Sequence, residues 1–242
     1  MRIVAIAALA AAALPAAPAA ARPPRVETMI VGQTRVLFGP RAVTVRATTV
    51  RAGGRRCAVG AATPLAALAA ARRAGGPGFA VRDFGSCSRS ARDAGGLFVN
   101  RVGRERNRGR NGWTYKVGTR AGTTGAADPA GSFGNGRRLR RGARVLWFWC
   151  RLGPRGCQRT LVVRPAARRV APGAPLTVRV TGYDDAGRGR PVAGARVTLG
   201  GRSALTGPGG RATLVAPRAG RHALRATRRG MVTAFPERVV VR

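Results

Sequence analysis

The chain is poor in the side chains that most enzymes use for catalysis. Among 242 residues it has one histidine, one lysine and eight carboxylates. General-base catalysis needs an oriented partner within reach, and His222 lies in a strand-like pattern with no nucleophile motif. The acidic residues do not form the paired motif of a glycoside hydrolase. We therefore expect no catalytic residues, and a protein that is not an enzyme.

Recognisable metal and cofactor motifs are lacking as well. The four cysteines never occur as Cys-x-x-Cys, and the single histidine is far from all of them in the sequence, which argues against zinc. Asp184 and Asp185 are interpreted as a turn, because aspartate accepts hydrogen bonds from nearby amides, although a calcium role stays open. The sequence therefore predicts no metal and no cofactor.

Long apolar runs are confined to the N-terminus. Met1 and Arg2 form a short positive region, residues 3–14 are all apolar, and small residues up to position 21 suit a signal peptidase. This run is too short to span a bilayer, and no later run of about 20 apolar residues follows it. We expect residues 1–21 to be a signal peptide. The rest is then extracellular, secreted or cell-wall associated, with no membrane span.

Positive charge is the most prominent feature that the chain does have. The formal net charge is +37, and 44 of the 45 basic residues are arginine. Residues 22–163 carry 28 basic and 5 acidic residues, and residues 164–242 carry 16 and 3. Nucleic-acid binders usually concentrate charge on one face, so we expect no specific nucleic-acid partner. Non-specific attraction to anionic cell-wall polymers is expected, and salt should weaken it.

The even number of cysteines in an exported chain indicates two disulfides. Three pairings are possible, and we favour Cys57 with Cys87 and Cys150 with Cys157. The first pair brackets a candidate helix, and the second flanks residues 151–156, which are typical of a hairpin loop. In the chain-entropy model these links contribute about 3.7 and about 2.5 kcal/mol.

Residues 22–163 combine several strands with one helix. Thr63 and Pro64 are favourable start residues for a helix over 64–74, and Gly75 is a favourable end. Strand patterns cover residues 26–50, 79–84, 97–102, 113–117, 145–150 and 158–163. The loop over 118–142 has a length that is usually functional or disordered. This mixture indicates an α+β domain.

Residues 164–242 differ in pattern, because the helical signals disappear. Short strands alternate with turns that are rich in glycine, proline and aspartate. The strands are expected at residues 176–183, 195–199, 212–215, 222–226 and 238–241. Regular spacing of this kind predicts a small all-β sandwich domain.

Several motifs in the first domain resemble those of a known family. Residues 112–117 match its Gly-Trp-x-Tyr-x-Val strand, residues 34–40 its first hairpin, and residues 62–68 its helix start. Together with residues 145–150 and 157–161, they resemble a secreted bacterial domain family of unassigned role. That family is related to the C-terminal domain of transcobalamin and intrinsic factor. The resemblance implies a β-grasp-like fold with one helix, and makes a corrinoid one candidate ligand.

The second domain carries a separate resemblance. Residues 190–199 match a Pro-Val-x-Gly-Ala-x-Val pattern, and residues 206–212 match Thr-x-x-x-Gly-x-Ala. These motifs are similar to those of bacterial immunoglobulin-like or carboxypeptidase-regulatory-like modules. The resemblance implies a sandwich fold that serves as a spacer or surface tether.

The aromatic residues are the best candidates for ligand contacts. Trp147 and Trp149 share one face of a predicted strand, and Trp113 and Tyr115 share one face of another. Core packing is the competing interpretation, because aromatic side chains dominate small cores. As a binding site they would form a shallow platform for a small molecule or glycan, walled by the loop over 118–142.

These features predict a secreted or cell-surface binding protein without turnover, with a β-grasp recognition module on a β-sandwich spacer. The alternative is a structural cell-wall-associated protein that its cationic surface holds in place, without any small-molecule ligand. Loss of ligand binding on replacing a tryptophan would favour the first. Release from cells by moderate salt would favour the second.

Overall fold

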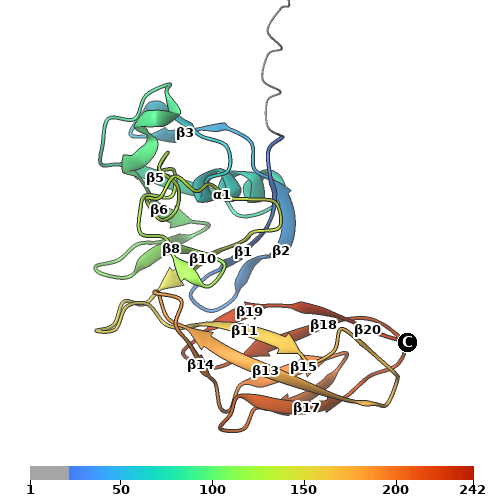
Figure 1. Cartoon of the computed structure of the whole chain (residues 1–242). Coiled ribbons are helices and arrows are strands. Elements are labelled where there is room, and N and C mark those ends of the chain that lie inside the picture. Colours follow the sequence, from blue (N-terminus) through green and yellow to red (C-terminus); the bar gives the residue numbers. More distant parts are fainter. Residues whose placement is uncertain (1–21) are drawn as a thin grey trace, which may run out of the picture.

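The computed structural model describes residues 22–242, so the expected signal peptide lies outside the described residues (Figure 1). Strands make up 49% of the described chain and helices 7%. The predicted α+β class with a β-grasp-like domain was therefore wrong, and the many sheets are consistent with an all-β sandwich. One α-helix of 10 residues and one 3-10 helix of 6 residues are too little to form a helical layer.

The N-terminal lobe (residues 22–157) is built on a five-stranded sheet with the order β2-β1-β10-β8-β9. Its strands are β1 (Arg25–Val31), β2 (Val36–Thr44), β8 (Gly112–Val117), β9 (Arg120–Ala121) and β10 (Arg144–Cys150). β1 runs parallel to β10, and all other neighbours are antiparallel. Alternate residues of these two central strands face two different cores, which explains why β10 is apolar from Val145 to Cys150 and β1 from Met29 to Val31.

Smaller sheets complete the outer end of this lobe (Figure 1). β3 (Thr48–Ala52) pairs with β4 (Arg55–Val59). A second small sheet has β5 (Phe79–Asp83), β6 (Leu97–Val102) and β7 (Glu105–Arg106), and the 3-10 helix Ala91–Gly96 precedes β6. The disulfide between Cys57 and Cys87 links β4 to the loop after β5, as predicted.

Helix α1 (Pro64–Arg73) packs against β1, β2 and β10, and it confirms the predicted start and end. The Thr63 hydroxyl accepts a hydrogen bond from the amide of Ala66 at 3.3 Å, and Gly75 takes a positive φ of 91° just after the helix. Every residue from Pro64 to Ala71 is buried. No helix of the described residues is long and apolar enough to cross a membrane.

The C-terminal lobe (residues 158–242) consists of two sheets around one core. The first sheet contains β11 (Thr160–Pro165), β13 (Pro175–Tyr183), β14 (Gly189–Pro191), β17 (Arg211–Val215) and β19 (Val232–Phe235). The second contains β12 (Arg169–Val170), β15 (Arg196–Leu199), β16 (Arg202–Leu205), β18 (Gly220–Thr227) and β20 (Glu237–Val241). β11 pairs with β13 and β19, although the sequence placed residues 158–163 in the first domain.

The two lobes share a third apolar core. The side chains of Met29, Leu146 and Phe148 project from the face of the N-terminal sheet opposite the helix. They pack against Val232 and Phe235 of the C-terminal lobe. These residues are all buried. Burial of this kind stabilises by roughly 1.5–3 kcal/mol for each large side chain, so this contact helps to hold the lobes together.

Candidate functional site

The four aromatic residues singled out from the sequence lie together, but inside the protein. Trp113, Tyr115, Trp147 and Trp149 are all at most 5% exposed and belong to the core of the N-terminal lobe. The predicted sharing of faces is confirmed, since Phe148 points the other way into the core between the lobes. The expected shallow platform is not seen in the described residues, because all four rings are buried in this core. Ligand binding by these four residues stays a prediction.

The loop over 118–142 helps to cover these rings. The hydroxyl of Tyr115 donates to the carbonyl oxygen of Thr124 in this loop at 3.0 Å. The indole of Trp113 donates to the carbonyl oxygen of Glu105 on β7, outside the loop, at 2.9 Å. Burial raises the pKa of Tyr115, and hydrogen bonds to the loop offset part of this effect. The polar atoms of the rings are thus used inside the protein, which fits core packing.

Lys116 is a polar residue whose role the sequence did not reveal. It is fully buried between the lobes. Its Nζ atom donates to the carbonyl oxygens of Asp184 at 2.9 Å and Tyr183 at 3.1 Å, and to the hydroxyl of Thr160 at 3.3 Å. A carboxylate oxygen of Asp185 lies 3.5 Å away. Burial lowers the pKa of Lys116, and the charge of Asp185 offsets part of that shift.

The turn predicted at Asp184 is confirmed. Its carboxylate accepts hydrogen bonds from the backbone amide of Arg188 at 2.8 Å and from the Arg188 side chain at 3.1 Å. The hydrogen bond from the backbone amide is the main reason that the pKa of Asp184 is lowered. The neighbouring Asp185 accepts from the amide of Cys157 at 2.8 Å, beside the predicted disulfide from Cys150, which is also present. No group of three metal-ligating side chains occurs within residues 22–242.

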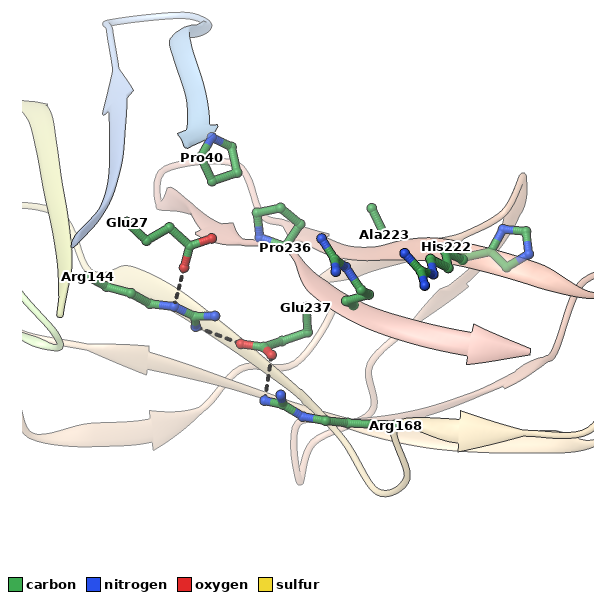
Figure 2. Close-up of a pocket in the computed structure, with 10 residues that line it drawn as sticks. Glu27, Pro40, Arg144, Arg168, His222, Ala223, Pro236 and Glu237 are labelled. Carbon is green, nitrogen blue, oxygen red and sulfur yellow. Dashed lines mark hydrogen bonds and ion pairs between the residues drawn. The ribbon is translucent and has the colours of Figure 1, made fainter. Parts of the chain in front are cut away.

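A cavity of about 620 Å³ lies where the lobes meet, and we call it the cleft (Figure 2). The N-terminal lobe contributes residues from β1, β2 and β10, and the C-terminal lobe contributes residues from β18, β20 and the segments before β12 and β20. Its lining residues are Glu27, Pro40, Arg144, Arg168, Arg221, His222, Ala223, Pro236, Glu237 and Arg238. Four arginines and two glutamates therefore face this space.

A chain of ion pairs crosses the cleft (Figure 2). Arg144 donates from Nε to Glu27 at 2.8 Å and from Nη1 to Glu237 at 2.6 Å. The other carboxylate oxygen of Glu237 accepts from Arg168 at 2.9 Å. Burial alone would lower the pKa of Arg144, but the hydrogen bonds and charges of Glu237 and Glu27 outweigh it and raise the pKa. Both acidic residues of the cleft are thus neutralised within the protein.

Two arginines of the cleft are left without an acidic partner. Arg221 on β18 and Arg238 on β20 are exposed, and neither forms a salt bridge within the described part of the chain. They share the outer face of neighbouring strands, because Arg221 pairs with Val240 and Arg238 pairs with Ala223. The side chain of Arg168, which lines the same cleft, is 72% exposed and forms an ion pair with one carboxylate, that of Glu237. The cleft therefore presents unpaired positive charge.

A second cavity of about 470 Å³ adjoins the cleft and shares Arg144, Arg168 and Glu237 with it. Leu146 and Phe235 give it apolar walls, and further arginine comes from Arg164. Arginines thus continue along the junction of the lobes. Reasoning from the sequence missed both cavities, because their walls come from segments far apart in the chain and no local motif marks them.

Comparisons with known proteins add little to this geometry. No family model and no curated protein matches the chain. Among solved structures, the D00-D0 domain of intimin is similar, with 16% sequence identity and a TM-score of 0.27. That match covers 68% of this chain and 78% of the intimin chain. A TM-score this low indicates neither a shared fold nor a shared function.

The resemblance to the transcobalamin-related family is not supported by these comparisons. The description of the C-terminal lobe as two packed sheets rests on its own strand pairing. The two disulfides fit an extracellular protein, because such bonds persist in oxidising compartments.

Proposed function

We propose that the chain is an exported, non-catalytic binding protein that holds an anionic polymer of the cell envelope in its cleft. The observation that carries this proposal is that Arg221 and Arg238 line the cleft without carboxylate partners among the described residues. Guanidinium groups bind phosphate and carboxylate through paired hydrogen bonds, which gives direction as well as attraction. A polymer with repeated negative charges suits such a row of arginines.

Two further features support the proposal. The net charge of +37 draws polyanions toward the whole surface, which raises the rate of encounter. The shared core and the ion pairs of Arg144 join the lobes on either side of the cleft, so the strands that carry its arginines are held in place before a ligand arrives. Export is supported by the expected signal peptide and by the disulfides.

The test compares two double variants with the same change in charge. R221Q/R238Q removes the unpaired arginines of the cleft, and R179Q/R211Q removes an exposed pair from β13 and β17. Binding of inorganic polyphosphate to residues 22–242 is measured by calorimetry at several salt concentrations. We expect the cleft variant to bind at least about tenfold more weakly, with a shallower salt dependence, and the control variant to change much less.

Equal losses in both double variants would show that diffuse charge, and not the cleft, holds the polymer. That outcome would favour the alternative of a structural wall protein held by its cationic surface. Turnover of a cell-envelope polymer by the purified protein would contradict the non-catalytic part of the proposal.

A further inference from the structure

The three-stranded sheet of β5, β6 and β7 separates its charges by face. β5 and β6 lie apart from the C-terminal lobe (Figure 1). One face of the sheet packs on the core of the N-terminal lobe through Val81, Val99 and Val102. Asp83, two residues after Val81, and Glu105, which pairs with Val102, belong to this inner face. The two acidic residues of these strands therefore point away from the outer face.

The opposite, outer face carries all three arginines of the same strands. Arg82 on β5 is exposed. The register shift between β5 and β6 places Arg101 opposite Ala80, on the face of Arg82. Arg106, also exposed, pairs with Arg101 across β6 and β7. None of these arginines forms a salt bridge within residues 22–242, so their charges are free to attract an anion.

Two exposed phenylalanines stand beside these arginines. Phe98 pairs with Arg82, and Phe84 lies two residues after Arg82, so both belong to the outer face. Phe84 is 70% exposed and Phe98 is 45% exposed. Their ring centroids are 5.9 Å apart in an edge-to-face arrangement, and the guanidinium carbon of Arg82 lies 5.8 Å from the centre of the Phe84 ring. The outer face is thus an apolar knob next to a cationic patch.

The loop that carries Phe84 is held in one shape. The amide of Phe84 donates to the carbonyl oxygen of Gly96 at 2.9 Å. The carboxylate of Asp83 accepts from the amide of Cys87 at 3.0 Å, and the disulfide to Cys57 joins this turn to β4. Binding through a preformed surface costs less conformational entropy, so the exposed ring is ready for a partner.

An apolar knob beside free arginines suits the surface of an anionic bilayer. Aromatic rings gain by leaving water for the boundary between lipid headgroups and acyl chains, whereas arginine keeps its charged end at the level of the phosphates. Each arginine near such a surface is attracted by its negative potential. Single-stranded nucleic acid needs separate aromatic platforms on which successive bases stack. Phe84 and Phe98 instead contact each other edge to face, which favours the lipid surface.

We infer that the outer face docks the protein on an anionic lipid bilayer. The rings of Phe84 and Phe98 enter the headgroup boundary, and Arg82, Arg101 and Arg106 pair with lipid phosphates. The protein lies on the membrane and does not cross it. The outer face shares no residue with the cleft, so this inference goes beyond the function proposed for the cleft.

The first experiment measures sedimentation of residues 22–242 with vesicles of equal parts phosphatidylglycerol and phosphatidylcholine. Vesicles of phosphatidylcholine alone are the lipid control and should bind much less. F84S changes an exposed side chain and should lower the partition coefficient about fivefold or more, because the bound ring leaves water. L205S, at an apolar position of the C-terminal lobe that is 60% exposed, should have no effect. Equal binding of F84S and the unmodified chain overturns the inference.

Two double variants with the same change in charge separate docking from diffuse attraction. R82Q/R106Q removes two arginines of the outer face, and R179Q/R211Q removes an exposed pair from the C-terminal lobe. We expect the first to lower the partition coefficient about tenfold or more and the second to change it much less. Circular dichroism checks that each variant is folded. Equal losses would show that the net charge alone holds the protein on the vesicles, against the inference.

A fluorescent reporter tests whether the knob enters the bilayer. The native tryptophans are at most 4% exposed, so their emission should barely respond to vesicles. We expect the emission of F84W to shift to shorter wavelength when anionic vesicles are added, because the indole leaves water. L205W, on the other lobe, should not shift. A vesicle-bound F84W whose emission stays unchanged overturns the inference.

The cleft and the outer face are tested independently. R221Q/R238Q should dock on vesicles as the unmodified chain does, and R82Q/R106Q should bind polyphosphate as the R179Q/R211Q control does. Loss of polyphosphate binding without loss of docking would therefore count against the cleft alone. If F84S weakens binding of single-stranded oligothymidylate more than binding of vesicles, the outer face is a nucleic-acid surface and the inference is wrong.

Discussion

Lys116 donates a hydrogen bond from Nζ to the carbonyl oxygen of Asp184 at 2.9 Å, and so joins β8 of the N-terminal lobe to the turn after β13 of the C-terminal lobe. It is the only lysine in a chain with 44 arginines. A compact ammonium can direct its donors to several acceptors around one point, whereas the planar fork of arginine needs more room. This geometry explains why a lysine stands at this position.

Replacing Lys116 with methionine should strongly destabilise the protein. The carbonyl oxygens of Tyr183 and Asp184 would lose a buried donor, and Asp185 would lose its nearest cation. We expect the free energy of unfolding in urea, followed by tryptophan fluorescence, to fall by about 3–5 kcal/mol. The control R221M removes an exposed cation and should cost under about 0.5 kcal/mol. A cost for K116M as small as that of R221M would show that this contact does not hold the lobes.

The contribution of Lys116 to stability should depend on pH. Burial lowers its pKa below the ordinary value of 10.5, so in the alkaline range below 10.5 the unfolded chain binds this proton more tightly than the folded chain. Stability therefore rises with pH through that window. We expect the difference in unfolding free energy between the unmodified chain and K116M to grow as pH approaches 10.5. A difference that shrinks with rising pH would mean that the pKa is raised instead.

Two glycines of the loop over 118–142 should respond differently to alanine. Gly131 and Gly136 both have positive φ, of 82° and 73°. A Cβ atom at Gly131 would meet the carbonyl oxygen of Arg137, whereas one at Gly136 would meet nothing within 4 Å. We expect G136A to cost about 1–2 kcal/mol for its backbone, and G131A about 1–3 kcal/mol more for the clash. Thermal unfolding measures both, and equal costs would show that the loop moves freely aside.

The tryptophans should be shielded from solvent. Trp113, Trp147 and Trp149 are at most 4% exposed, so acrylamide should quench their fluorescence several-fold less than it quenches N-acetyltryptophanamide. Measuring the slope of quenching against acrylamide concentration checks this. Quenching as efficient as that of the free compound would mean that the rings form an open platform after all.

Local features of the fold were predictable from the sequence. The ends of α1 follow from Thr63 and Gly75, whose effects act within one turn of the helix. The pairing of Cys150 with Cys157 follows from the short hairpin between them. The shared face of Trp147 and Trp149 follows from the alternation of side chains along a strand.

Other features could not be predicted, because they depend on segments that are distant in the chain. The helix at 64–73 favours an α+β class, but its ten residues are a small part of a mostly β protein, and only the pairing of distant strands shows this. The sequence pattern of residues 160–163 predicts a strand, but only the pairing with β13 and β19 places that strand in the C-terminal lobe. The amino-acid pattern of a strand does not indicate which sheet the strand joins.

The sequence by itself determined the charge, the cysteines, the helix ends and the faces of the strands, because these depend on residues a few positions apart. Only the tertiary structure decided which arginines are neutralised. Arg144 and Arg168 meet Glu237, while Arg221 and Arg238 meet no carboxylate in the described chain. Ion pairing acts over a few ångströms in space between groups that are far apart in the chain, so folding alone sets where the free charge lies.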